Sequence, residues 1–135
     1  MTNITDIYEM LDWNKPSEIQ SRGRELAQGV ENLELFIQPL FLKYNKNIWD
    51  NCARILASKS DDELSLYFVK LFEWLQDMNW PGACLIYDRL LCAKKESIDF
   101  AYQHSLKIAK QSNDCVWEKV LKGFYADFIV DKTKK

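Results

Sequence analysis

Apolar side chains recur every three to four residues along most of the chain, a spacing that places them on one face of an α-helix. Ile4, Ile7, Tyr8 and Leu11 follow this spacing and predict a short first helix. Pro16 suits the first turn of a second helix, because the N–H that proline lacks would have no helical partner there. The apolar stripe of that second helix comprises Ile19, Gly23, Leu26, Ala27 and Val30.

The middle of the chain predicts a short helix, a second helix and then a long core helix. Asn32 can cap the short one, which must end before Pro39 because proline disfavours a helical residue ahead of it. The second carries Ile48, Cys52, Ile55 and Leu56. Ser60 and Glu63 then have the spacing of a capping box, so the long helix should begin there. Its apolar arc comprises Leu64, Tyr67, Phe68, Leu71, Phe72, Trp74, Leu75 and Met78.

The last third of the chain predicts three more helices. Pro81 can open the first, which is apolar almost all round from Ala83 to Ala93 and should therefore be covered on more than one side. Ser97 can cap the second. The apolar face of the second helix comprises Ile98, Ala101, Tyr102, Ser105, Leu106, Ile108 and Ala109. That of the third comprises Val116, Trp117, Val120, Leu121, Phe124 and Phe128.

Composition supports one all-α domain. The 135 residues suit a single domain, and four Gly and three Pro are too few for the turns of a many-stranded sheet. We expect an all-α domain over residues 1–130, with about seven antiparallel helices, and a disordered charged tail over residues 131–135. The helix that is apolar on opposite sides favours a HEAT-like α-α superhelical array, and a helical bundle is the alternative.

One segment carries a family resemblance. The run W-L-Q-D-M-N-W-P-G-A at residues 74–83 resembles a signature of a family of small bacterial proteins of unknown function that is built from HEAT-like helical hairpins. Residues 46–53 form a looser second patch. The resemblance implies a compact α-α array and brings no established active site. Most of the signature suits a structural corner, with Asn79 in the turn, while Gln76 and Asp77 have no evident packing role.

The charge distribution and the absence of long apolar stretches limit the expected classes of partner and the expected cellular location. The net charge is −2, from 20 acidic and 18 basic residues that are interleaved, so no broad positive field attracts nucleic acid or an anionic membrane. No stretch approaches the roughly 20 apolar residues needed to cross a bilayer, and the first residues do not form an export leader. The sequence therefore predicts a cytoplasmic protein without a membrane partner.

The sequence contains no recognisable set of catalytic residues. Cys52, Cys84, Cys92 and Cys115 lie too far apart for a zinc or redox motif and are interpreted as small buried apolar residues. His104 is the only histidine and is expected to pack on Phe100 one helical turn earlier. Glycine-rich phosphate loops and nucleophile elbows are absent from the sequence. We therefore predict no enzymatic activity, no catalytic residue, no metal ligand and no cofactor.

Stacked helical hairpins whose sequence contains no catalytic or metal-binding motif favour a protein-binding module. Within that class, an immunity-type protein that neutralises a toxic partner with a basic domain fits the small size and the acidic balance. One alternative is a nucleic-acid-binding enzyme built from helical repeats, similar to base-excision glycosylases. A second alternative is a structural homo-oligomer.

The candidate partner-binding residues lie on the polar side of the long helix expected from Ser60. Counting about 100° per residue, the side opposite the apolar arc includes Leu66, Val69, Glu73, Gln76 and Asp77. Leu66 and Val69 are apolar residues on this otherwise polar side, which is typical of a protein contact. The competing interpretation is that another helix covers them. Asp50 and Arg54 are the second candidate region.

Overall fold

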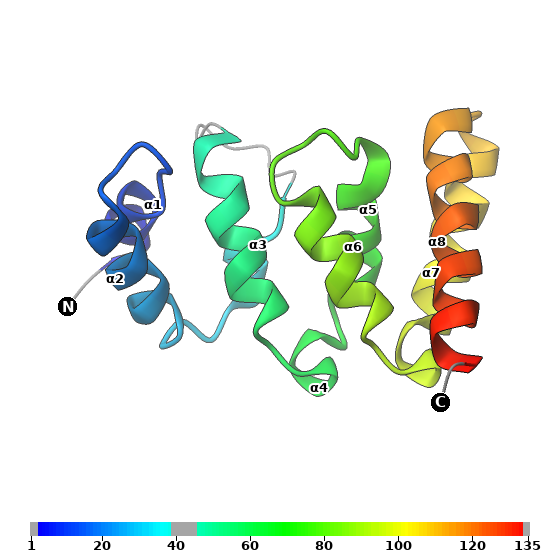
Figure 1. The fold of residues 1–135 in the computed structure, drawn as a ribbon, viewed down its shortest axis with the longest axis horizontal. Coiled ribbons are helices and arrows are strands. Elements are labelled where there is room, and N and C mark those ends of the chain that lie inside the picture. The colour runs from blue at the N-terminus through cyan, green and yellow to red at the C-terminus, as the bar shows by residue number, and fades with distance from the viewer. Residues whose placement is uncertain (1–2, 39–45, 134–135) are drawn as a thin grey trace.

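All regular structure that the chain forms in its described part is helical (Figure 1). The computed structural model describes residues 3–38 and 46–133. Its α-helices and 3₁₀ helices (η) are α1 (Ile4–Met10), α2 (Ser17–Ala27), η1 (Leu33–Phe36), η2 (Lys46–Ile48), α3 (Trp49–Ala57), α4 (Asp61–Leu64), α5 (Phe68–Glu73), η3 (Trp74–Gln76), α6 (Ala83–Leu91), α7 (Lys95–Gln111) and α8 (Cys115–Thr133). The predicted all-α fold class is confirmed.

The helices follow one another along the long axis of the molecule. Figure 1 shows α1 and α2 at one end and α7 and α8 at the other, with α3, α6 and α8 in a front row and α5 and α7 behind them. Within these rows α3 packs on α6 and α5 on α7, and between the rows α7 packs on α8. Because α6 also contacts α8, the prediction that this helix is covered on more than one side is confirmed. The arrangement fits a helical bundle.

Aromatic side chains fill the core where α5, α7 and α8 meet. Phe72 makes edge contacts with Tyr102 and Phe124, at ring separations of 6.0 and 5.3 Å. The indole N–H of Trp117 donates to the Phe72 carbonyl at 3.1 Å, so its only polar atom is satisfied inside the core. Truncating one buried ring of this kind typically costs roughly 3–5 kcal/mol.

Side-chain caps begin four of the described helices, and two of these caps were predicted. One of the four is at α8, where Asp114 accepts from the N–H of Trp117 at 3.0 Å. Asn32 accepts from the N–H of Glu34 at 3.2 Å, and Ser60 and Glu63 form both bonds of the capping box. Asn3 caps α1 by accepting from the N–H of Asp6 at 2.9 Å. The short helix ends at Phe36, before Pro39, as predicted.

The long helix expected from Ser60 to Met78 is wrong. The chain forms α4, a turn over residues 65–67, α5 and then η3. The two helices have different partners: Asp61 of α4 binds Arg89 of α6 and the N–H of Lys94, whereas α5 packs on α7. A single straight helix could not serve both, so the turn redirects the chain between them.

Two predicted helix starts differ from those observed, the first by two residues and the second by three. The helix expected at Pro81 begins at Ala83, because Gly82 adopts a left-handed conformation (φ 84°) as its N-cap. The helix expected after a Ser97 cap begins at Lys95. Its N-cap residue, Lys94, donates its N–H to the Asp61 carboxylate at 2.9 Å, so the cap comes from α4 and no local pattern could reveal it.

Three predictions about the last hairpin are corrected. Val116 and Ile108 were expected in the core and are 68% and 40% exposed, because α7 and α8 bury other sides against their neighbours. Fraying from Asp131 onward is wrong for residues 131–133, which continue α8. Lys132 fixes this end: its ammonium donates to the Leu91 carbonyl at 3.1 Å and lies 4.9 Å from the centre of the Phe128 ring.

Candidate functional site

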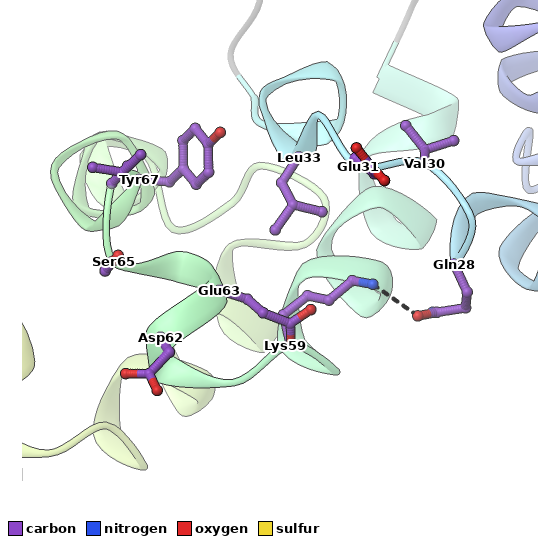
Figure 2. A pocket seen from close by; sticks show the side chains of 10 residues that line it. Gln28, Val30, Glu31, Leu33, Lys59, Asp62, Glu63, Ser65 and Tyr67 are labelled. Atoms are coloured by element: carbon purple, nitrogen blue, oxygen red, sulfur yellow. Dashed lines mark hydrogen bonds between the residues drawn. The ribbon is translucent and has the colours of Figure 1, made fainter.

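A groove separates the segment after α2 from the region around α4 (Figure 2). Its volume is about 350 Å³. Figure 2 shows the Lys59 ammonium reaching across to the Gln28 side chain, to which it donates a hydrogen bond of 2.9 Å. The lining residues are Gln28, Val30, Glu31 and Leu33 on one side, and Lys59, Asp62, Glu63, Ser65, Leu66 and Tyr67 on the other.

The groove is apolar in part and acidic at its edge. Three carboxylates, from Glu31, Asp62 and Glu63, face one cation, Lys59, which leaves a net charge of −2 (three minus one). The Ser60 N–H donates to the Glu63 carboxylate and lowers its pKa. A negative rim around apolar side chains favours a ligand that is both cationic and apolar.

Leu66 is the most exposed large apolar side chain in the described part of the chain. It is 84% exposed and lies in the turn between α4 and α5, next to the groove. The residues that flank this turn, Leu64 and Phe68, both point inward, and the Tyr67 N–H closes the turn onto the Leu64 carbonyl at 2.8 Å. Leu66 is thereby held toward solvent.

A salt bridge fixes α4 and with it one wall of the groove. The Arg89 guanidinium donates to Asp61 at 2.6 Å and to the Lys59 carbonyl at 3.0 and 3.2 Å. The second Asp61 oxygen accepts from the Lys94 N–H. Burial by itself would raise the pKa of the Asp61 carboxyl, but the Lys94 N–H and the Arg89 cation outweigh it and hold this pKa below its usual value.

This depressed pKa predicts an acid-sensitive contribution to folding. A carboxyl whose pKa is lower in the folded state stabilises fully above its unfolded pKa, and the stabilisation disappears as pH falls through the folded pKa. Between about pH 5 and about pH 2, the unfolding free energy of the wild type should fall more steeply than that of Asp61→Asn. Urea denaturation at each pH measures it, and parallel curves for the two proteins would contradict the assignment.

The structure separates the residues that the sequence placed on one binding face. Leu66 borders the groove, whereas Val69 is half-buried against the core. Glu73 ends α5, and Gln76 ends η3. Asp77 belongs to the following turn, where its carboxylate accepts from the Asn79 N–H at 2.8 Å. The single face assumed one continuous helix and is wrong because that helix breaks at residues 65–67.

The competing interpretation was that another helix covers Leu66 and Val69. Among the described residues it is wrong for Leu66, which is exposed, and holds in part for Val69, which packs against the core. The second candidate region forms a pair on α3, where Arg54 donates to Asp50 at 3.1 Å. Arg54 lines a different hollow, between α2 and α3. This hollow and the groove share Gln28, so the two lie next to each other.

Residues 74–83 form a tightly packed corner against α3. The Trp74 indole N–H donates to the Pro81 carbonyl at 3.0 Å, and Trp49 makes edge contacts with Trp74 and Trp80 at 6.1 and 5.5 Å. Gly82 packs directly on Trp49, Ala53 and Trp74. Asp77 also has a role here, since it caps the turn through Asn79.

Sequence reasoning missed half of the groove. Val30, Glu31 and Leu33 lie about thirty positions before the residues they face, and no local pattern links the two segments. Glu63 was interpreted only as one partner of the capping box. The one usable signal was Leu66, an apolar residue on a polar side.

A family model described as a domain of unknown function, DUF5071, matches residues 44–135. The chain belongs to the DUF5071 family. The matched region contains the corner at residues 74–83 and one wall of the groove, while Gln28 to Leu33 on the other wall precede it. Membership agrees with the expected family of unknown function. No match to this chain was found among curated proteins or solved structures.

In the DUF5071 chain, the predicted burial of the cysteines is confirmed for one of them and wrong for the other three. Cys52 is buried, and burial raises the pKa of its thiol to about 12. The other three, Cys84, Cys92 and Cys115, are exposed, because α6 and α8 bury other sides. His104 is exposed and stacks on Phe100 at 5.9 Å, as predicted.

The described part of the DUF5071 chain lacks two further features. Among the described residues, no three His, Cys, Asp or Glu side chains are grouped closely enough to bind a metal ion. Within the same residues, no helix combines the length and the apolar character needed to cross a bilayer.

Proposed function

We propose that this DUF5071 protein is a protein-binding module that contacts its partner through the groove beside Leu66. The observation that carries the proposal is the exposure of Leu66, 84%, at the edge of a groove lined by three carboxylates and one cation. Exposed apolar side chains within a polar rim are typical of the centre of a protein interface. The partner segment would place an apolar side chain against Leu66 and a Lys or Arg near Asp62 and Glu31.

The finer proposal is an immunity-type role, in which the partner is a toxic protein with a basic domain. The negative groove supports it through charge complementarity, which accelerates association and suppresses wrong partners. A HEAT-like stack would suit this role, since its ridged surface offers extended contact area. A neighbouring gene that encodes a protein with a basic C-terminal domain would supply the partner for a direct binding test.

The test is affinity capture from the native host followed by titration of the purified partner. Leu66→Ser should weaken binding by about 1–3 kcal/mol, roughly 5- to 150-fold, as for an interface hot spot. The matched control is Phe100→Ser, which removes an apolar side chain of similar exposure, 77%, on the far hairpin. Equal affinity of wild type and Leu66→Ser would place the contact elsewhere.

The same substitution should hardly affect folding. Because Leu66 contributes little to the core, Leu66→Ser should change the unfolding free energy by less than about 0.5 kcal/mol. Urea denaturation of the purified variant measures this. A loss of about 2 kcal/mol or more would mean that Leu66 packs in the folded protein, and it would end the groove proposal.

A further inference from the structure

Uncovered apolar surface is concentrated on the last hairpin. Of the eight large apolar side chains exposed in the described part of the chain, five lie on α7 and α8: Phe100, Ile108, Val116, Ile129 and Val130. These helices form one end of the molecule, and Figure 1 shows no helix beyond them. The terminal helices of a stack usually carry a polar outer face, so an apolar one indicates a missing neighbour.

The middle of α8 contains a glycine that nothing inside the described structure explains. Gly123 is exposed, and a Cβ added there would meet no atom within 4 Å. Glycine in a helix interior costs roughly 0.5–1 kcal/mol relative to alanine. Gly82, by contrast, is surrounded by close neighbours. A glycine on an open face allows the backbone of a further helix to approach closely.

The residues around Gly123 are arranged symmetrically along α8. Val116 and Val130 lie seven residues before and after it, and Lys119 and Asp127 lie four residues before and after it. At about 100° per residue all four fall within about 40° of Gly123, and all are exposed. The apolar positions match across this centre, while the charged positions have opposite signs.

When two copies of one helix pack antiparallel, residues at equal distances before and after the crossing point face each other. Opposite charges at these two positions therefore attract. In a twofold interface each surface meets its own copy, so the residue at one offset faces the residue at the opposite offset. Centred on Gly123, Lys119 of one copy lies beside Asp127 of the other, and Val116 lies beside Val130. Lys119 makes no ion pair among the described residues, and the Tyr87 hydroxyl donates to Asp127 at 2.5 Å, which holds that carboxylate in place.

We propose that the outer face of α8 binds a second copy of this chain, with the two α8 helices antiparallel and crossing at Gly123. The occupant follows from the charge complementarity of this face with itself. The contact spans one helix of 19 residues, so its area lies at the low end for specific interfaces. The dimer should therefore be weak and dependent on concentration and salt.

Sedimentation velocity of the full chain, from about 10 μM to about 1 mM, tests association. The mass should rise from 16.0 kDa toward twice that value. Gly123→Leu should block close approach and lower the association constant at least about tenfold without unfolding the chain. Lys119→Asp and Asp127→Lys should each weaken the dimer similarly, and the double exchange should restore it. Thermal melts confirm folding of each variant, and Leu66→Ser should associate like wild type.

Cysteine cross-linking tests the direction of the helices, in a background where Cys84, Cys92 and Cys115 are serine. Gly123→Cys should cross-link to itself. Val116→Cys should cross-link only with Val130→Cys, since two copies of position 116 would lie about 20 Å apart and a disulfide needs Cα atoms within about 7 Å. A monomer throughout the concentration range, a dimer indifferent to Gly123→Leu and Lys119→Asp, or self-cross-linking of Val116→Cys would each overturn the proposal.

Discussion

Replacing Gly82 with alanine should lower the unfolding free energy by about 2–5 kcal/mol. Gly82 has a positive φ of 84°, which a side chain disfavours, and the added Cβ would lie 2.8 Å from the Ala53 Cβ and 2.9 Å from the Trp49 carbonyl oxygen and Trp74 Cζ2. Backbone and a fully buried indole cannot move aside cheaply, so strain and overpacking add. Urea denaturation gives the change as a shift of the midpoint.

The matched control is Gly123→Ala, measured at a protein concentration low enough to keep the chain monomeric. This glycine lies inside α8 with open space around it, so alanine should stabilise by roughly 0.5–1 kcal/mol. The same chemical change should therefore have opposite signs at the two positions. If Gly82→Ala had the same unfolding free energy as the wild type, the corner at residues 74–83 would not be tightly packed.

Asn51→Leu should destabilise the fold by about 3–5 kcal/mol. Asn51 is 2% exposed and joins α1, α2 and α3. Its amide donates to the Leu11 carbonyl at 2.7 Å and to Gln20 at 2.9 Å, and its carbonyl accepts from Arg24 at 2.6 Å. Leucine has a similar shape but makes none of these bonds, so the buried Leu11 carbonyl would lose a partner and Arg24 a charge-assisted bond.

Chemical denaturation measures the total loss, and hydrogen exchange locates it. Because Asn51 ties the first two helices to α3, protection should fall most in α1 and α2 and least in α7 and α8. Asn14→Leu is the matched control at an exposed asparagine and should change stability by less than about 0.5 kcal/mol. Uniform loss of protection across the chain would contradict the tethering role.

The proposed groove and the proposed dimer face use separate surfaces and can fail separately. Leu66 belongs to the link between α4 and α5, whereas Gly123 lies on α8 at the end of the molecule (Figure 1). A dimer that survives Leu66→Ser, together with a partner that still binds Gly123→Leu, would support both. Loss of partner binding in both variants would instead indicate that the partner recognises the dimer.

The sequence by itself determined the fold class, most helices and two of the caps. Periodic apolar positions predicted α1, α2, α3, α6, α7 and α8, since a helix repeats its face every few residues and the pattern is local. Asn32 and the Ser60 and Glu63 pair predicted their caps for the same reason, because both partners lie within three residues. The sequence also placed Leu66, an apolar residue, on the polar side of its helix, but it left open whether another helix covers this side chain.

Only the tertiary structure decided where the long helix breaks, what lies around Leu66 and which apolar residues stay exposed. The break at residues 65–67 depends on Asp61 binding Arg89 and Lys94, about thirty positions away. The groove needs Val30 and Leu33 opposite Leu66, and Asn51 acts through Leu11 and Gln20. Val116 has the pattern of a core residue and is nonetheless exposed, because none of the described helices covers that side of α8. Periodicity tells which side chains share a face of one helix, but burial and pairing depend on the other helices that the fold brings against that face.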